Sequence, residues 1–435
     1  MTQLRGRAIL HRAMIAAVLP IVLYGCGSGN GTIGKGTDAR AAGLVSGRSV
    51  KLNNYNNWLY SASDPADEGR KLELAARHEK LAMPLEYGWE TVTPAMVHAI
   101  NPACEAYLCV PDLAQKGTWE RDQADSEGPL RIQNIMPRTE IESNGWWLVD
   151  TTSGEPLSWL DKDENVLEEV MVDVGKPGYK EAVLGRLLRQ MDGKGYAGAI
   201  LGYSCPHPSW VVPIEKTRYG TDHNWQEQAW WPLLEYLTNG LHAAGYKVIG
   251  VSSGEWNTGI DYYERQRSYC DGVILEKFAL QPDGSYYTDL NVIRNRIAGL
   301  TQDPLEQWVM DLGMRPDKPN YAQKAQLALA MYYIGVGASP DRRGSFHYRG
   351  DSKLFWDPLW DFYIGSPAEP PVKRTGKYFW SRKFTQGIVL LNYESADPVT
   401  YTLEATYQDP SGKVMSGEVT LPAHTGMILA AHAPN

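Results

Sequence analysis

The sequence predicts an α/β protein, a (β/α)8 TIM barrel followed by a small C-terminal antiparallel β-sandwich domain. Short apolar runs bounded by turn residues alternate with helix-like segments over roughly 300 residues, as in a parallel barrel of about eight strands. One such run, Val273-Ile274-Leu275, is too short for a helix and too apolar for a solvated loop. After Pro367, short apolar runs continue without helix-like segments between them, which indicates a separate β domain.

The composition is that of a globular protein with a large core, because 43% of the 435 residues are hydrophobic and 21% are charged. A formal net charge of -9 leaves no surplus of basic residues to neutralise phosphates, so we expect no nucleic-acid partner. The 15 Trp and 25 Tyr far outnumber the 6 Phe. Flat rings that also hydrogen-bond suit the faces of sugars, and this favours a carbohydrate partner.

Residues 1–26 have the order of a bacterial lipoprotein signal. Arginines precede an apolar run over residues 13–24, and Leu23-Tyr-Gly-Cys26 resembles a lipobox, in which the cysteine is diacylated after cleavage. An ordinary secretory signal is the alternative. We expect Cys26 to anchor the chain to a membrane of the bacterial cell envelope, and the Gly-, Ser- and Thr-rich residues 27–46 to form a flexible tether.

Residues 47–367 are expected to form the barrel. A helix should begin at Thr93-Pro94, with the threonine as N-cap and the proline in the first helical position. Apolar positions at helical spacing predict further helices over residues 178–192, 227–244 and 321–333. The predicted strands are 57–60, 106–110, 145–150, 169–173, 196–203, 247–251, 270–276, 307–311 and 344–349, and residues 81–89 are interpreted as a connection.

Residues 368–435 are expected to form the C-terminal β domain. Pro370-Pro371 is typical of a linker, and turn signals such as Pro410-Ser-Gly412 separate the apolar runs. The predicted strands are residues 387–391, 400–406, 417–421 and 427–430.

The cysteines after Cys26 are expected to be mostly buried free thiols. Cys104 and Cys109 bracket one predicted strand and are too far apart to bond. Cys205 follows a strand whereas Cys270 precedes one, so these two should lie at opposite ends of the barrel. No spacing matches a zinc site and no glycine-rich loop matches a phosphate-binding motif, so we expect no metal and no cofactor.

Glu276 is the first candidate catalytic residue, because TIM barrels carry their chemistry at the C-terminal ends of the strands. Side chains alternate along a strand, so Gly272, Ile274, Glu276 and Phe278 share one face, which is expected to line the barrel interior. The alternative is that Glu276 only forms a structural ion pair, for instance with Lys277.

Asp311 and Asp173 end two other predicted strands and are candidate partners of Glu276. If Glu276 and Asp311 lie on adjacent strands, their carboxyl groups approach each other, and burial would keep one of them protonated as an acid. Asp173 precedes Gly175-Lys-Pro177 and is as well explained as the cap of that turn.

Five further residues near predicted strand ends are candidate substrate-binding residues. They are Tyr203, Trp256, His347, Tyr348 and Arg349. Aromatic rings there would stack on sugars, and the polar groups would hold hydroxyls. The alternatives are ordinary packing for the aromatic residues and a hydrogen-bonded lid on the core for the last three.

Several stretches resemble a known family in their order along the chain: residues 173–179, 271–276, 329–333, 356–358 with 364–367, and 382–392. The last contains the pattern Arg382-x-Phe384-x-x-Gly387, which opens that family's C-terminal β domain. The family consists of bacterial glycoside hydrolases known as hypothetical family fifteen, which are distantly similar to endo-polygalactosaminidases. The resemblance spans about residues 80–430 and implies an exported barrel that acts on polysaccharides.

The sequence departs from that family on the predicted fourth strand. Members typically carry Asp-Gly-Val-Phe-Leu-Asp-Asn there, with the second Asp as the favoured catalytic residue, whereas residues 197–203 place Ala197 and Gly202 at the two acidic positions. Glycoside hydrolysis ordinarily needs two carboxyl groups. Two hypotheses therefore stand: a hydrolase that uses Glu276 with Asp311 or Asp173, and a degenerate barrel that binds polysaccharide without cutting it. The sugar, the linkage, the stereochemistry and the oligomeric state stay open.

Overall fold

The computed structural model describes residues 48–54, 68–83, 92–110, 113, 115–116, 136–160, 166–201, 208–210, 212–252, 265–275, 277–281, 283–302, 305–311, 314, 319–337, 344–348 and 356–432. The expected signal, Cys26 and the tether lie outside these residues. Within the described ranges, no helix has both the length and the apolar character needed to cross a membrane.

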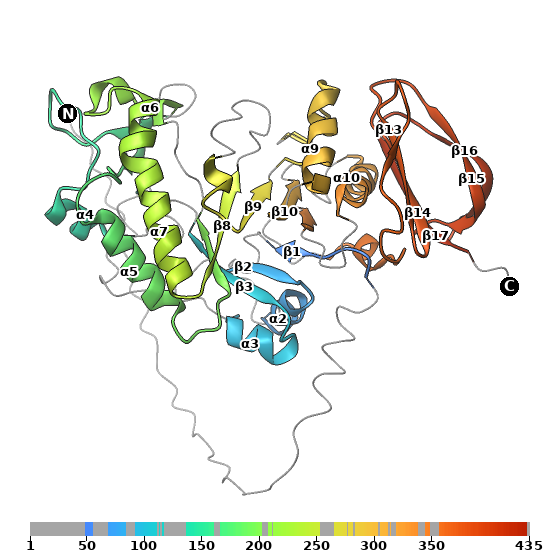
Figure 1. Ribbon diagram of the computed structural model, residues 1–435, viewed down its shortest axis with the longest axis horizontal. Coiled ribbons are helices and arrows are strands. Elements are labelled where there is room, and N and C mark those ends of the chain that lie inside the picture. Colours follow the sequence, from blue (N-terminus) through green and yellow to red (C-terminus); the bar gives the residue numbers. More distant parts are fainter. Residues whose placement is uncertain are drawn as a thin grey trace, which may run out of the picture.

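A closed ring of parallel strands forms the main body of the molecule (Figure 1). Its strands are β1 (Asn53–Asn54), β2 (Lys80–Met83), β3 (Glu105–Val110), β7 (Gly198–Leu201), β8 (Lys247–Ser252), β9 (Gly272–Leu275), β10 (Glu306–Asp311) and β11 (Gly344–Tyr348). Each neighbouring pair is parallel. A parallel bridge between Leu52 and Phe346 closes the ring, with Phe346 N donating to Lys51 O at 2.9 Å. The predicted (β/α)8 barrel is confirmed.

The helices lie outside the ring, as Figure 1 shows. They include α2 (Glu68–Ala76), α3 (Pro94–Ile100), α5 (Tyr179–Met191), α7 (Trp231–Ala243), α9 (Leu290–Gln302) and α10 (Tyr321–Gly335). The predicted cap of α3 is confirmed, because Thr93 Oγ1 accepts from Met96 N at 3.3 Å and Pro94 occupies the first turn. Helix α7 ends just before Gly245, which has a φ of 84°, a conformation that favours glycine.

Three strand assignments differ from the sequence prediction. Residues 81–83, interpreted as part of a connection, belong to β2. The strand predicted at 57–60 lies outside the described residues and is not among these three, and β1 lies at Asn53–Asn54. The strands predicted at 145–150 and 169–173 are not barrel strands, because an insertion between β3 and β7 contains them.

That insertion forms its own antiparallel sheet of β4 (Gln115–Lys116), β5 (Ser158–Leu160) and β6 (Val166–Met171), flanked by α4 (Arg138–Asn144). Trp147 and Val149 make single antiparallel bridges to Val172 and Pro156. Short apolar runs look alike in sequence, and only their pairing partners reveal which sheet they join. With the insertion removed from the count, β7 is the fourth barrel strand, as expected for residues 196–203.

The barrel interior is filled by alternate residues of its strands. They form one core cluster of Ala82, Tyr107, Cys109, Ile200, Ile249, Val251, Ile274, Trp308 and Met310. The intervening residues of the strands pack outward against the helices.

Charged residues close the N-terminal end of the barrel. Lys80, Glu105, Lys247 and Glu306 each begin a strand. Lys80 Nζ lies 2.7 Å from Glu105 Oε2 and 2.6 Å from Glu306 Oε1, and Lys247 Nζ lies 2.8 Å from Glu105 Oε1. Burial opposes ionisation of Glu105, but Lys80 and hydrogen bonds from Lys247 and Tyr107 outweigh it and lower its pKa to about 2.

The C-terminal domain is antiparallel throughout, as predicted. Its strands are β12 (Val372–Lys373), β13 (Phe379–Phe384), β14 (Gly387–Asn392), β15 (Val399–Gln408), β16 (Val414–Leu421) and β17 (Thr425–Ala431), paired in the order β12-β13-β14-β17-β15-β16. The strands make one continuous sheet that curls around a core to which β13 to β17 all contribute. β13 was not predicted from the sequence.

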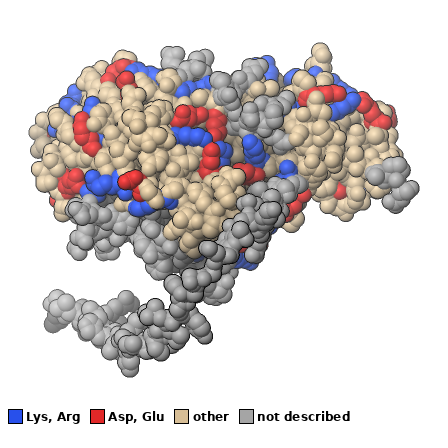
Figure 2. All heavy atoms as spheres, turned by 60° about the horizontal axis from the view of Figure 1, so that its bottom comes forward, with Lys and Arg blue, Asp and Glu red and all other residues tan. Residues whose placement is uncertain are grey.

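The other face of this sheet packs on helix α10 of the barrel. Gly426 of β17 allows the close approach, because a Cβ there would lie 2.6 Å from Ala330 Cβ and 2.6 Å from Gln326 O. On the face drawn in Figure 2, Lys and Arg are interspersed with Asp and Glu over both the barrel and the β domain.

Candidate active site at the carboxyl end of β9

The strand that leads to Glu276 is a barrel strand, and its interior face is the one that the sequence predicts. Ile274 belongs to the interior core, whereas Val273 and Leu275 pack outward. Glu276 itself lies outside the described residues, but both of its chain neighbours are described. Phe278, expected on the interior face, instead packs in the outer core. The alternation breaks at Lys277, whose φ of 62° turns the chain.

The turn that follows Glu276, residues 277–280, is fixed by many hydrogen bonds. Phe278 N donates to Met310 O of β10 at 3.1 Å. The carbonyl of Lys277 accepts from Tyr287 Oη at 2.8 Å and from the Arg296 guanidinium, which also donates to Phe278 O at 2.9 Å. Nothing in the sequence pattern of Tyr287 or Arg296 indicated this role.

Asp311 ends β10 and binds the same turn. Its Oδ1 accepts from Ala279 N at 2.8 Å and from Leu280 N at 2.9 Å. The side chain is fully buried and shares the outward face of β10 with Val309, opposite Trp308 and Met310. The Asp311 side chain therefore lies on the outward face of β10, with its carboxylate against the turn. Strands β9 and β10 are adjacent, as the expected pairing with Glu276 requires, but Glu276 lies outside the described residues, so the approach of the two carboxyl groups stays a prediction.

Burial raises the pKa of Asp311 to about 6, although the amides of Leu280 and Ala279 and the charge of Arg296 favour its ionised form. Its Oδ2 has no hydrogen-bond partner among the described residues. A buried carboxyl group in this position holds backbone amides, and it lies out of contact with solvent.

Asp173 lies in the insertion, beyond β6, and not at the end of a barrel strand. Its carboxylate accepts from Arg218 Nε at 2.9 Å, from Tyr219 Oη at 2.5 Å and from Gly175 N at 3.2 Å. The side chain is 2% exposed. The hydrogen bond from Gly175 N confirms the interpretation of Asp173 as the cap of the turn that follows it. The ion pair between Asp173 and Arg218 joins the insertion to the segment between β7 and β8.

His347 lies in a buried aromatic cluster. It is 1% exposed, and its ring centroid lies 6.0 Å from that of His78 and 5.6 Å from that of Trp360. Burial and the neighbouring His78 hold the pKa of His347 well below its usual range, so the ring is neutral at pH 7. This placement favours the alternative in which His347 covers the core over the one in which it binds a substrate.

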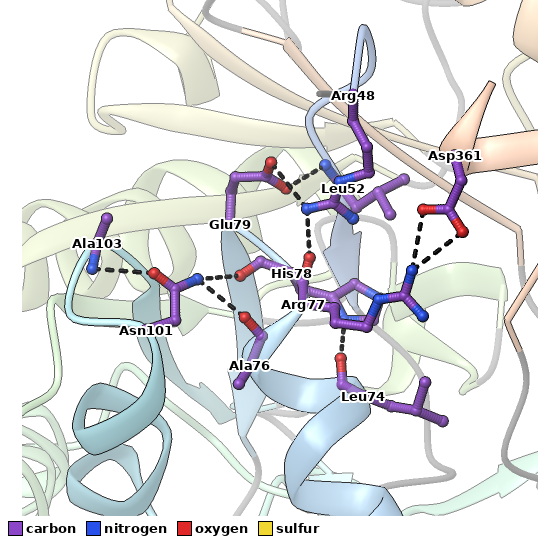
Figure 3. A network of polar contacts seen from close by, with 10 residues as sticks. All are labelled: Arg48, Leu52, Leu74, Ala76, Arg77, His78, Glu79, Asn101, Ala103 and Asp361. Carbon is purple, nitrogen blue, oxygen red and sulfur yellow. Dashed lines mark hydrogen bonds and ion pairs between the residues drawn. The ribbon is translucent and has the colours of Figure 1, made fainter. Parts of the chain in front are cut away.

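His78 belongs to a network at the start of β2 (Figure 3). Its Nδ1 lies 2.8 Å from Leu74 O of α2, while the adjacent Glu79 accepts from Leu52 N at 2.7 Å and from Arg48 Nη2 at 3.2 Å. This network ties α2 and β2 to the segment that leads into β1.

The side chains of the other four candidate substrate-binding residues lie outside the described part of the chain. Tyr203, Trp256 and Arg349 lie outside the described residues, and only the backbone of Tyr348, which ends β11, is described.

The described cysteines Cys104, Cys109 and Cys270 are buried free thiols, as expected, and burial raises the pKa of Cys270 to about 12. Within the described ranges, no group of three or more His, Cys, Asp or Glu side chains is arranged to hold a metal ion.

Comparison with solved structures finds glycoside hydrolases. A maltogenic alpha-amylase, AmyB, from Thermotoga neapolitana is 8% identical, with a TM-score of 0.48 over 89% of this chain and 99% of that one. An alpha-amylase from Malbranchea cinnamomea is 11% identical, with a TM-score of 0.46 over 88% and 97%. An alpha-galactosidase variant from Geobacillus stearothermophilus, in complex with stachyose, is 11% identical, with a TM-score of 0.43 over 91% and 58%.

Among curated proteins, none matches the chain. A family model described as hypothetical glycosyl hydrolase family 15 matches residues 118–388. The matched span runs from the insertion through the fourth to eighth barrel strands and into β14, and it includes β9, the turn after Glu276 and Asp311. Because this span covers more than half of the 435 residues, the chain belongs to hypothetical glycosyl hydrolase family 15.

Proposed function

We propose that the protein is an exported, surface-anchored glycoside hydrolase that acts on an extracellular polysaccharide, with Glu276 as the acid/base residue. The observation that carries the proposal is the place of Glu276 in the chain. It lies between β9, whose Ile274 lines the barrel interior, and a turn that is fixed by hydrogen bonds on several sides. The C-terminal ends of barrel strands are where this fold carries its chemistry.

Hydrolysis of a glycosidic bond uses one carboxyl group to protonate the leaving oxygen and a second to act on the anomeric carbon or on a water. Asp311 and Asp173 are buried and engaged with protein groups, so neither supports the role of partner well. The partner is better sought in segments that directly follow other barrel strands. These segments carry Asp112, Glu255, Asp317 and Asp351.

Replacing Glu276 tests the proposal. Glu276→Gln keeps the shape of the side chain but removes its proton chemistry, so kcat should fall by roughly 100-fold or more while glycan binding persists. The measurement is release of new reducing ends from a panel of purified polysaccharides. Glu404→Gln, on an exposed strand of the β domain, is the matched control and should leave kcat unchanged. A Glu276→Gln protein as active as the wild type refutes the assignment.

A second candidate function is polysaccharide binding without hydrolysis. The observation that favours it lies in the sequence of the segment 197–203, which contains the fourth strand, β7. There Ala197 and Gly202 occupy the positions that carry acids in the family. A glycan array combined with product analysis separates the two functions. Binding without new reducing ends supports a receptor or scaffold, and turnover excludes it.

Export and anchoring belong to the same proposal and rest on residues 1–26 alone. The order of arginines, apolar run and Leu23-Tyr-Gly-Cys26 supports lipidation of Cys26, with residues 27–46 as the tether to the barrel. Incorporation of a labelled fatty acid by the wild type but not by Cys26→Ser tests it.

A further inference from the structure

The turn at 277–280 is bound from two directions, by the barrel and by the C-terminal domain. On the barrel side, Asp311 Oδ1 accepts from two successive amides, Ala279 N at 2.8 Å and Leu280 N at 2.9 Å. On the other side, Tyr393, which follows β14, donates its hydroxyl to Ala279 O at 2.5 Å. The peptide groups around Ala279 are therefore held at both their N–H and their C=O.

Tyr393 also connects the turn with the loop that precedes α9. Its hydroxyl accepts from Tyr287 N at 3.3 Å, and Tyr287 in turn donates its own hydroxyl to Lys277 O at 2.8 Å. Tyr393 is fully buried, and its ring packs edge-on against Tyr286 and His424. A tyrosine of the β domain thus reaches a backbone segment only a few residues from Glu276.

These bonds hold the backbone of the turn in an energetically unfavourable conformation. Lys277 has a φ of 62°, a left-handed conformation that costs a residue with a β carbon about 1 kcal/mol or more. Such a conformation persists only where surrounding contacts fix it. The contacts that fix it include the hydrogen bonds from Arg296 and Tyr287 to Lys277 O and those that Asp311 accepts from the Ala279 and Leu280 amides.

We propose that Asp311 and Tyr393 are positioning residues for the candidate site: together they lock the turn that directly follows Glu276 in the chain. This inference rests on the proposed function of Glu276. It assigns to Asp311 a role other than proton transfer, and it gives the C-terminal domain a part in the active site. A carboxylate displaced by about 1 Å from its productive place costs roughly 100-fold in rate.

The test compares variants that keep or remove each hydrogen bond. Asp311→Asn retains an oxygen that accepts from the Ala279 and Leu280 amides, whereas Asp311→Ala does not. We expect Asp311→Ala to lower kcat by about 10- to 100-fold with little change in KM, and Asp311→Asn to keep most of the activity. Tyr393→Phe should lower kcat by a smaller factor. Tyr401→Phe, in the same domain, is the matched control and should leave kcat unchanged.

Amide hydrogen exchange of the full-length protein without substrate provides a readout that does not depend on activity. Exchange at Ala279 and Leu280 should accelerate in Asp311→Ala and in Tyr393→Phe, but not in Tyr401→Phe, under conditions where all variants have the near-UV spectrum of the folded wild type. Unchanged exchange at these amides in Asp311→Ala overturns the proposed lock.

The kinetic outcomes separate the remaining roles. Equal loss of kcat in Asp311→Asn and Asp311→Ala means that Asp311 transfers protons itself, and it overturns the positioning role. Faster exchange with an unchanged kcat per folded molecule means that the turn is structural only, which also overturns it. A wild type that hydrolyses no glycan refutes the proposed function instead, while the exchange rates still decide whether Asp311 and Tyr393 lock the turn.

Discussion

At the residue scale, burial determines the charge of several titratable groups near the barrel strands. Burial lowers the pKa of His78 to about 3 and raises that of Asp311 to about 6. Two backbone amides partly offset the cost of a charge on Asp311, but no lysine or arginine forms an ion pair with it among the described contacts. The pKa of its carboxyl group, about 6, therefore lies well above that of an ordinary aspartate.

The titration of Asp311 predicts a pH dependence of stability. Its folded pKa lies above its unfolded value, so its contribution is fully present below about pH 4 and is lost as the pH rises through about 6. Relative to Asp311→Asn, the free energy of unfolding of the wild type should fall by about 3 kcal/mol over this window. Urea unfolding of both proteins from pH 4 to 7.5 measures the difference. Parallel profiles contradict the raised pKa.

At the element scale, the Arg382-x-Phe384-x-x-Gly387 pattern joins β13 to the end of helix α10. Arg382 is 2% exposed and donates Nη1 to Tyr333 O at 2.9 Å, to Ile334 O at 3.0 Å and to Val336 O. The Phe384 ring lies 5.4 Å from the Tyr333 ring. At Gly387, a Cβ would lie 2.3 Å from Leu429 O, so no larger residue fits. The arginine thus caps the helix carbonyls, which favour a cation.

We expect Arg382→Met to lower the free energy of unfolding by about 3 kcal/mol, because several buried carbonyls lose their charged donor. Arg382→Lys should recover only part of the loss, since one ammonium group does not reproduce the planar guanidinium. Arg374→Met removes an exposed arginine of the same domain that donates to Thr400 O at 3.2 Å, and should change stability by about 0.5 kcal/mol or less. Denaturant unfolding measures all three, and equal losses for Arg382→Met and Arg374→Met would argue against the cap.

At the scale of the whole molecule, the barrel and the β domain share one hydrophobic core. The cluster that contains α10 also contains Trp380, Phe384, Val389, Leu391 and Ile428 of the β domain. Helix α10 is buried nearly all round, from Leu327 to Gly335, because barrel strands cover one side and the β domain covers the other. The barrel and the β domain therefore stabilise each other and are not independent domains joined only by a linker.

Residues 368–435 should accordingly not fold alone. Their own core is small, and separation from α10 exposes the apolar face of β13, β14 and β17 to water. We expect the isolated segment to show no cooperative melting and poorly dispersed amide resonances, whereas the same residues in the full chain are protected from exchange. A cooperative melt of the isolated segment would contradict this dependence.

The sequence by itself determined what depends on local pattern. The parallel barrel, the antiparallel C-terminal domain, the N-cap at Thr93 and the interior face of β9 all follow from spacing, caps and the alternation of side chains, which neighbouring residues set. Membership of the family, too, is carried by short motifs in a set order.

Only the tertiary structure decided what depends on partners distant in the chain. Residues 169–173 resemble a barrel strand, yet β6 pairs inside an insertion. Asp311 ends a barrel strand as expected, but its carboxylate faces outward and binds a turn 31 and 32 residues away in the sequence. Tyr393 reaches Ala279 across 114 residues. Such contacts form when folded elements pack, and no periodicity in the sequence encodes which turn, strand or helix will lie opposite a given side chain.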